Sequence, residues 1–508
     1  MTNRTHEDRA SIPGLAKAFS GDAISLLDRL RQWPVFEPGL DERAADMERW
    51  RTAVETRLGR GKPRRVLFVH GQLPGETGSG VYLQQIARES IRQGIDFHLL
   101  SAGYETLDAT HIQGVPEDRI HTCLFTPEGE MPKPGRVKTP ISGMSVVMPY
   151  PVLAFRDRTD DDLIDWLSVF GNRLAERVYR LQPDVIHVNH LWFLNGLSRL
   201  IAPWIPLVAS AHGTAHKLIV DAPRFRDLVV PCVSSADHVC AISPESVREC
   251  VAMFQIPEER ISIEGYGYEP DLFHCRSVHG TRVIKDAFGY DLGPAARLAV
   301  AVGKFADWKG FKEFAVAIGL LREQGFDMVG IIVGEGDQPS RADLEAFIAD
   351  RGLAEHVRLP GKVARTVLPD IYRAADVYVL PSHAEPFGLV LMEALACGTP
   401  SVSANAGGPP HYVPKALTEK GLAVLVDPIK TTPDGEILPQ DRSIYAGNIA
   451  AGIETILNQA IGGKERTLIA DAMKHLRWDG LVKNLLRIYD RALDDALARG
   501  TKSTSATP

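Results

Sequence analysis

The feature that most constrains the fold of this chain is a repeated alternation of short apolar runs with longer amphipathic stretches. Apolar runs rich in β-branched residues occur at 64–71 (RRVLFVHG) and 297–305 (RLAVAVGKF), and each is followed by a stretch with helical spacing. Strands that alternate with helices predict a parallel sheet with helices on both faces. The sequence therefore indicates an α/β protein with doubly wound sheets.

The alternation occurs in two series, and a chain of 508 residues is also too long for one hydrophobic core. We expect two Rossmann-like domains that face a cleft, joined by a linker at 273–294. The expected segments are a helical N-terminal extension at 1–60, an N-terminal domain at 61–275, a C-terminal domain at 290–475, a helix at 476–500 that packs back on the N-terminal domain, and a disordered tail at 501–508. Ligands of open α/β sheets bind beyond the carboxyl ends of the strands, so the cleft is the expected site.

Charge and cysteine content argue against several classes of protein. The formal net charge is −7 and no dense block of Lys and Arg occurs, which argues against a nucleic-acid-binding or membrane-surface protein. The six cysteines form no C-x-x-C pair, which favours free thiols in a reducing compartment. The N-terminus lacks a secretory signal, and no apolar run reaches the roughly 18 residues of a membrane span. We expect a cytoplasmic protein, and the sequence leaves peripheral membrane contact and oligomeric state open.

Two glutamates, Glu385 and Glu393, flank an apolar stretch in the segment 383–408 (HAEPFGLVLMEALACGTPSVSANAGG). A helix is expected to begin at 386–388, which places Glu385 at its mouth. Eight helical residues span roughly 12 Å. Two carboxylates that act on the same bond usually lie about 5–10 Å apart, so this distance is too long for such a pair. The spacing suits the two ends of an elongated ligand, with helix N-terminal N–H groups between them for a phosphate. A nucleotide sugar has this shape; the alternative is a helix with two glutamates of no special role.

Two further segments carry residues that could bind a phosphate or a sugar. Lys304 and Lys309 follow a predicted strand in VGKFADWKG and can neutralise a diphosphate, although solvated surface lysines are the simpler interpretation. The glycine-rich loop at 74–80 (PGETGSG) can bring backbone close to a phosphate or a sugar. It matches neither the G-x-G-x-x-G nor the G-K-[ST] pattern, so an ordinary turn between strand and helix remains the alternative.

Two histidine pairs end predicted strands, in HVNH (His187, His190) and HGTAH (His212, His216). The second pair lacks the glutamate of H-E-x-x-H, and no cysteine–histidine set has zinc spacing. We therefore predict no metal site. The histidines are expected to line the cleft, and the alternative is a structural role.

The motifs together resemble those of the retaining GT-B glycosyltransferases of family 4, also called group 1. EPFGLVLME resembles the E-x7-E signature of the family, and VGKFADWKG resembles its V-G-R-x-x-x-x-K-G segment. VGEGD at 333–337 and VRLPGKV at 357–363 resemble further family segments in the same order. The resemblance is strong over about 296–428 and looser over 64–270, and it does not extend to residues 1–60.

The resemblance implies a role for each matched position. Glu385 would contact hydroxyls of the donor sugar, and Glu393 would hold those of the ribose. Lys304 and Lys309 would bind the diphosphate, and His212 would lie near the transferred sugar. The other implied donor-binding positions are Gly78, Ser79, Gly80, Gly361, Val363, Phe387, Gly388 and Leu389.

The implied reaction is a retaining transfer of sugar from a nucleotide diphosphate sugar, preferably a UDP-sugar, without a cofactor or a metal. The acceptor would be a small molecule or a glycan, recognised by loops of the N-terminal domain such as 126–145. Lys304 stands where the family usually has arginine, His411 where an acidic residue is common, and 264–273 departs from the family pattern. The alternatives are a catalytically silent nucleotide-sugar-binding or scaffold protein, and an epimerase or phosphorylase with the same fold.

Overall fold

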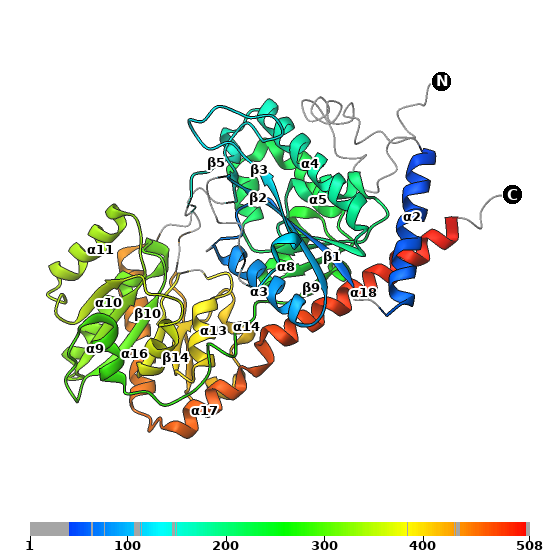
Figure 1. Ribbon diagram of the computed structural model, residues 1–508. Coiled ribbons are helices and arrows are strands. Elements are labelled where there is room, and N and C mark those ends of the chain that lie inside the picture. Colours follow the sequence, from blue (N-terminus) through cyan, green and yellow to red (C-terminus); the bar gives the residue numbers. More distant parts are fainter. Residues whose placement is uncertain are drawn as a thin grey trace. The chain divides into compact units, whose positions relative to one another are not determined.

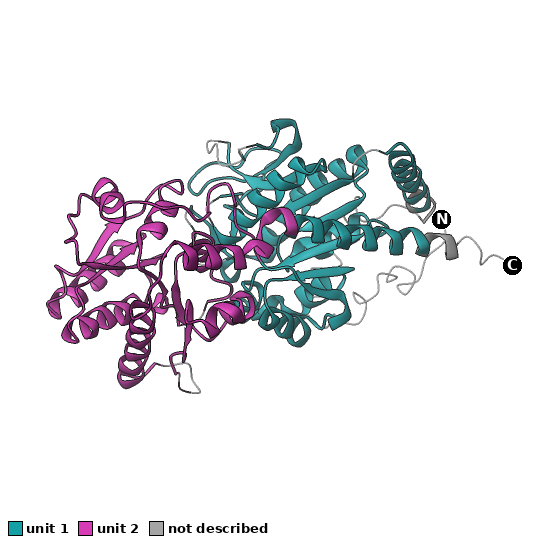
Figure 2. Ribbon diagram, turned by 90° about the horizontal axis from the view of Figure 1, so that it is seen from below, with its two compact units in different colours: residues 1–265, 481–508 teal, residues 266–480 magenta. Residues whose placement is uncertain are grey.

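The computed structural model describes residues 40–503, apart from 62–63, 76, 106–111, 113, 145–147, 149, 384, 431 and 433–436 (Figure 1). Most of the expected N-terminal extension, residues 1–39, therefore lies outside the described residues. The chain forms two compact units, one of residues 1–265 with 481–508 and one of residues 266–480 (Figure 2). Each unit contains its own parallel sheet flanked by helices, which confirms the predicted doubly wound α/β class.

Unit 1 is built on a seven-stranded sheet of order β3-β2-β1-β6-β7-β8-β9, and its paired strands are parallel. The strands are β1 (Arg65–His70), β2 (Asp96–Gly103), β3 (Ile120–Leu124), β6 (Val185–Val188), β7 (Leu207–Ala211), β8 (His238–Ala241) and β9 (Ile261–Ile263). A separate short pair comprises β4 (Ser142–Gly143) and β5 (Leu153–Ala154). The helices are α2 (Leu40–Gly59), α3 (Gly78–Arg92), α4 (Asp160–Leu181), α5 (Phe193–Ile201), α6 (Ala215–Asp221), α7 (Arg226–Ser234), α8 (Pro244–Phe254) and most of α18 (Trp478–Ser503).

Side-chain caps set where several of these helices begin. The Thr77 hydroxyl accepts from Gly80 N at 3.0 Å at the start of α3, and Thr159 and Asp162 form a reciprocal capping box on α4. Such a cap contributes about 1 kcal/mol because it satisfies an N–H group that has no partner within the helix. The buried face of α4 follows helical spacing and comprises Leu163, Trp166, Leu167, Phe170, Gly171, Leu174 and Val178.

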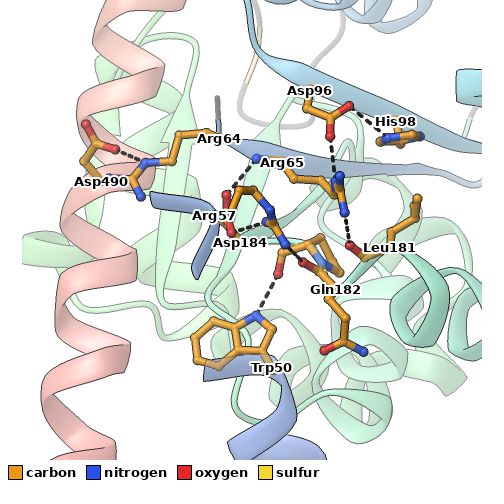
Figure 3. A network of polar contacts seen from close by, with 11 residues as sticks. Trp50, Arg57, Arg64, Arg65, Asp96, His98, Leu181, Gln182, Asp184 and Asp490 are labelled. Atoms are coloured by element: carbon orange, nitrogen blue, oxygen red, sulfur yellow. Dashed lines mark hydrogen bonds and ion pairs between the residues drawn. The ribbon is translucent and has the colours of Figure 1, made fainter. Parts of the chain in front are cut away.

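Within the expected helical extension, residues 40–59 form the helix α2, and buried polar contacts hold it on unit 1. Trp50 Nε1 donates to Pro183 O at 2.7 Å, and the Arg57 guanidinium pairs with the buried Asp184 carboxylate (Figure 3). Arg64 Nε lies 2.6 Å from Asp490 Oδ1 on α18. The helix α2 and most of α18 therefore belong to unit 1.

Unit 2 contains a six-stranded parallel sheet of order β12-β11-β10-β13-β14-β15. The strands are β10 (Arg297–Val302), β11 (Met328–Val333), β12 (Val357–Gly361), β13 (Val377–Leu380), β14 (Ser401–Ala404) and β15 (Ala423–Val426). The helices are α9 (Gly280–Phe288), α10 (Phe311–Glu323), α11 (Gln338–Asp350), α12 (Leu368–Ala374), α13 (Leu389–Ala396), α14 (Pro409–Tyr412), α15 (Lys415–Glu419), α16 (Pro439–Leu457) and α17 (Gly463–Ala472).

Two expected irregular segments contain helix. The helix α9 lies within the expected linker at 273–294. Ile284, which is fully buried, packs this helix on unit 2, and Gly289 ends it in a left-handed conformation. The helix α18 continues to Ser503, so the expected tail at 501–508 begins inside a helix. Across the described part of the chain, no helix is both long and apolar enough to cross a membrane.

Candidate active site

The strand order of unit 2 reverses between β10 and β13, where open α/β sheets characteristically bind ligands. The loop after β10 carries Lys309, and the loop after β13 carries Glu385. Lys309 Nζ donates to Glu385 Oε2 at 2.6 Å, and Ser382 Oγ donates to the same oxygen at 3.1 Å. Both charged side chains are largely buried, at 13% and 14% exposure. The structure thus brings together two residues that the sequence separates widely.

Backbone contacts join the two loops that carry this pair. His383 N donates to Trp308 O at 2.8 Å. Gly310 has φ +70°, and a Cβ atom added there would lie 1.9 Å from Pro381 O. Only glycine fits such an approach in a left-handed conformation. This glycine therefore allows Lys309 to approach the loop after β13.

Two further glycines, Gly407 and Gly408, contact the backbone of Glu385. Gly408 N donates to Glu385 O at 2.9 Å. A Cβ added at Gly407, which has φ +66°, would lie 2.1 Å from the same carbonyl oxygen. The two glycines after β14 thus let the chain pass directly against the loop of Glu385.

The helix α13 begins at Leu389, slightly later than expected, after Gly388 with φ +90°. Glu393 therefore lies about one turn into the helix, and the residues between the two glutamates are only partly helical. Tyr412 OH donates to Gly388 O at 2.9 Å, and the Tyr412 ring stacks on Phe387 at 4.7 Å between centroids. The first N–H groups of α13 have no partner within the helix, so this fixed end can accept an anion.

Glu393 is buried on α13, with 4% of its surface exposed. Burial raises the pKa of its carboxyl to about 6, and the nearby Arg365 opposes this rise. Arg365 Nη2 lies 3.1 Å from Glu393 Oε1 and donates to Glu269 Oε1 at 3.0 Å. Tyr372 OH donates to the other oxygen of Glu393 at 3.4 Å. Sequence reasoning missed Arg365, because nothing in its neighbours indicates that it reaches α13.

A charged network lies beneath the Lys309–Glu385 pair. Arg442 of α16 donates to Glu313 Oε1 at 2.5 Å and to Asp307 Oδ2 at 2.6 Å. His383 Nε2 lies 3.3 Å from the buried Glu313. Burial raises the Glu313 pKa, but His383 and Arg442 outweigh it, and the net pKa is lowered. The network connects both loops to α10 and α16, and sequence reasoning missed Glu313 and Arg442.

The remaining predicted residues of unit 2 also follow carboxyl ends of strands. Lys304 is exposed after β10, and its charge adds to the hydrogen bonds from Ser340 that lower the Asp337 pKa. Gly361 ends β12 with φ +98° and accepts from Gly334 N at 3.1 Å, and the partly buried Val363 follows two residues later.

The predicted residues of unit 1 gather where its strand order reverses, between β1 and β6. Asn189 follows β6 and links three segments: its Nδ2 lies 3.2 Å from Ser79 O and 3.1 Å from His70 Nδ1. Its Oδ1 lies 3.1 Å from His212 Nε2. Burial lowers the pKa of His212 to about 3 and that of His70 to about 4, so both imidazoles are neutral near pH 7.

The glycine-rich loop forms a tight turn into α3, which begins at Gly78. A Cβ added at Gly80 would lie 2.1 Å from Gly75 O, so the turn needs a glycine at this position. His187 has the structural role that the sequence left open, since its ring nitrogens lie 2.6 Å from Tyr489 OH and 2.8 Å from Ser210 Oγ. Among the residues that the structure describes, no group of three or more His, Cys, Asp or Glu side chains could hold a metal ion.

Known proteins match the chain across both units. Residues 77–272 match the model of Glycosyltransferase Family 4, and residues 288–427 match that of Glycosyl transferases group 1. The D-inositol 3-phosphate glycosyltransferase of Thermomonospora curvata is 30% identical over 445 residues, 82% of this chain and 91% of that protein. The chain belongs to glycosyltransferase family 4. A relative of the same name from Acidothermus cellulolyticus is 27% identical over 489 residues, 90% of this chain and 97% of the relative.

Solved structures resemble this family 4 glycosyltransferase along most of its length. Anabaena HepE in complex with UDP and glucose superposes with a TM-score of 0.60 at 17% identity, covering 84% of this chain and all of that one. Sucrose-phosphate synthase from Thermosynechococcus elongatus gives a TM-score of 0.59 at 19% identity, covering 85% of this chain. The fold is GT-B, and the predicted family and enzyme class are confirmed.

Proposed function

We propose that this glycosyltransferase moves a sugar from a UDP-sugar to an acceptor hydroxyl with retention of configuration. The observation that carries the proposal is the Lys309–Glu385 contact of 2.6 Å at the reversal point of the unit 2 sheet, next to the N-terminus of α13. A cation and a helix N-terminus are suited to a diphosphate, and the carboxylate is suited to sugar hydroxyls. The complexes of HepE with UDP and glucose support the choice of donor.

In the proposed reaction, the bond between the sugar C1 and the diphosphate oxygen breaks while the acceptor oxygen bonds to C1 on the same face. The acceptor proton passes to the departing diphosphate. Lys309, Lys304 and the α13 N-terminus stabilise the charge that develops on the diphosphate. Glu385 orients the sugar through its hydroxyls, and Glu393 holds the ribose. These groups supply positive charge from the protein itself, so we propose that transfer requires neither a metal nor a cofactor.

The neutral His212 is proposed to contact the sugar, with Gly78, Ser79 and Gly80 as further donor contacts. Its pKa of about 3 means that it acts as a hydrogen-bonding imidazole and carries no charge at neutral pH. Backbone of Phe387, Gly388 and Leu389 is proposed to contact sugar and phosphate, and backbone at Gly361 and Val363 the base. Each of these assignments extends the family resemblance and predicts a loss of donor affinity on substitution.

The test measures UDP binding, UDP-sugar hydrolysis and transfer to an acceptor panel that begins with D-inositol 3-phosphate, the molecule named for the relatives. Glu385→Gln and Lys309→Ala are expected to reduce turnover about 100-fold or more. The exposed Glu419→Gln and Lys415→Ala serve as matched controls. Turnover near that of the unsubstituted enzyme in both site variants would overturn the mechanism. UDP binding by the unsubstituted enzyme without hydrolysis or transfer would favour the catalytically silent alternative.

The same experiment tests two finer points. The anomeric configuration of the product, read by NMR coupling constants, is expected to match that of the donor. Transfer in the presence of EDTA is expected to equal transfer without it. An inverted product, or loss of activity that Mg²⁺ or Mn²⁺ restores, would contradict the retaining or the metal-free part of the proposal, respectively.

A further inference from the structure

Unit 1 contains a small cavity that none of the roles described above uses. It lies next to the reversal point of the sheet, between the ends of β1 and β6, the short strand β4 and the buried face of α4. Its volume is about 20 Å³, room for a group the size of one or two water molecules. The polar residues in its wall are Gln72, Ser142, Trp166, His190 and Trp192.

Each of these five residues has a buried polar atom without a hydrogen-bond partner in the described structure. The atoms are Gln72 Nε2, Ser142 Oγ, Trp166 Nε1, His190 Nε2 and Trp192 Nε1. Each residue is at most 7% exposed. Buried polar atoms in native proteins nearly always have a partner, so five such atoms around one small cavity need an explanation. A polar group of a ligand that enters the cavity would supply the missing partners.

The chemistry of the wall limits which group can enter. The two indoles and the amide nitrogen only donate hydrogen bonds, so the group must carry oxygen atoms that accept. Burial keeps His190 neutral by lowering its pKa well below the usual value. Among the described residues that line the cavity, none has a carboxylate, ammonium or guanidinium group. A wall of neutral donors is suited to alcohol oxygens, whereas a phosphate or carboxylate would be buried without a charged partner.

Ring contacts connect this cavity to His212, the residue of unit 1 that is proposed to contact the sugar. The His190 ring lies 5.1 Å from that of His212 and stacks on that of His70 at 5.5 Å. The Trp192 ring packs at 5.3 Å from Phe155, which also lines the cavity. Aromatic faces next to hydrogen-bond donors are suited to the mixed apolar and polar surface of a sugar or cyclitol ring.

We propose that this cavity is an acceptor subsite that receives a hydroxyl or hydroxymethyl group of a neutral polyol ring. The inference rests on the proposed function, because the ligand it assigns is the acceptor of that reaction. Trp192, Trp166 and Gln72 then determine acceptor specificity, because N–H groups of two of them can donate to the two lone pairs of the alcohol oxygen. The His190 ring connects this subsite to His212, the histidine proposed to contact the sugar.

Trp192→Phe tests the subsite, since it removes the indole N–H and keeps an aromatic ring. Trp204→Phe is the matched control: Trp204 Nε1 also lacks a partner, but Trp204 does not line the cavity. Binding of myo-inositol, measured by saturation-transfer NMR without donor, is expected to weaken about tenfold in Trp192→Phe and to stay unchanged in Trp204→Phe. Gln72→Met provides a second variant if Trp192→Phe does not fold, as judged by near-UV circular dichroism.

Inorganic phosphate is the second probe, and it is expected not to compete with myo-inositol. Competition by phosphate that Trp192→Phe abolishes would overturn the neutral-polyol assignment. Equal myo-inositol binding in folded Trp192→Phe, Gln72→Met and the unsubstituted protein, or a crystal structure with only water in the cavity at saturating myo-inositol, would overturn the subsite itself. Because this binding assay needs no donor, its failure is distinguishable from a failure of UDP-sugar transfer.

Discussion

The Arg365 guanidinium lies 3.1 Å from the buried carboxylate of Glu393, the residue expected to hold the ribose. The side chain of Arg365 is 41% exposed, whereas the side chain of Glu393 is 5% exposed. Burial raises the pKa of Glu393 to about 6, and Arg365 limits that rise. The ionisation of the carboxyl group that is proposed to bind the ribose thus depends on its own burial and on Arg365, a residue of the loop after β12.

Affinity for a UDP-sugar is expected to fall as the pH decreases through about 6. Glu393 then becomes protonated and loses the charge that accepts hydrogen bonds from ribose hydroxyls. In Arg365→Met, removal of the cation raises the Glu393 pKa further, so the decline is expected to begin at a higher pH. Isothermal titration calorimetry of a UDP-sugar from pH 5 to 8 measures both profiles, because its diphosphate, unlike that of UDP, has no proton that titrates near pH 6. The imidazoles of His70 and His212, with pKa values of about 4 and 3, do not titrate there. A flat profile in the unsubstituted enzyme would contradict the prediction.

Glu393→Gln is expected to stabilise the fold at pH 7.5 while it weakens UDP binding. The folded-state pKa of about 6 exceeds the ordinary value of 4.5, so stability from this group is present below pH 4.5 and is lost as the pH rises through 6. Glutamine has no charge to bury, and the gain in unfolding free energy at pH 7.5 is up to about 2 kcal/mol. Urea unfolding at pH 7.5 and pH 4.5 measures the difference. A lower stability of Glu393→Gln at pH 7.5 would show that its carboxylate is a net stabilising contact.

Gly310→Ala is expected to destabilise the fold more than Gly352→Ala does. Both glycines have similar left-handed φ values, +70° and +67°, so both substitutions introduce about 1 kcal/mol of strain. The Gly310 Cβ would also collide with Pro381 O, whereas nothing lies within 4 Å of a Cβ at Gly352. Thermal unfolding measures stability, and UDP-sugar hydrolysis should fall in Gly310→Ala alone. Equal effects of Gly310→Ala and Gly352→Ala on stability and on hydrolysis would show that neither property depends on the contact between the two loops.

Arg442→Met is expected to destabilise the protein by about 2 kcal/mol, because Glu313 stays buried without its nearest charged partner. Turnover should fall while KM for the donor changes little, since Asp307 loses the contact that holds the Lys309 loop. Adding Glu313→Gln should restore part of the stability without restoring turnover. Arg358→Met removes an exposed ion pair and is the control, expected within about 0.5 kcal/mol of the unsubstituted enzyme. If the double variant were no more stable than Arg442→Met, the unpaired Glu313 carboxylate would not be the cause of the lost stability.

The predicted fold class, family and most element positions came from local patterns. Alternating apolar runs marked the strands, and Pro386 indicated a helix start at 386–388, close to the observed start of α13 at Leu389. The linker at 273–294 was only partly right, since it contains α9, which a single buried apolar residue, Ile284, anchors. Local composition could not show that burial, because it depends on packing against the rest of unit 2.

The partners of the candidate site residues were not predictable in the same way. Arg365, Glu313 and Arg442 carry no motif, and each acts on residues at least twenty-eight positions away in the sequence. The wall of the cavity in unit 1 likewise contains polar atoms from four separate segments. The tryptophans and the glutamine among them belong to no sequence motif, so the sequence does not predict the cavity. A charged side chain in a sequence shows its chemistry but not its neighbours.

The sequence by itself determined the two doubly wound sheets, the family and the positions of the expected donor-binding residues, because these depend on periodicity and on short motifs. Only the tertiary structure decided that Lys309 meets Glu385, that Arg365 reaches Glu393, and that five polar side chains surround one cavity. The physical reason is that a parallel sheet brings loops from distant parts of the chain to one edge. The resulting distances set charge, pKa and hydrogen bonding.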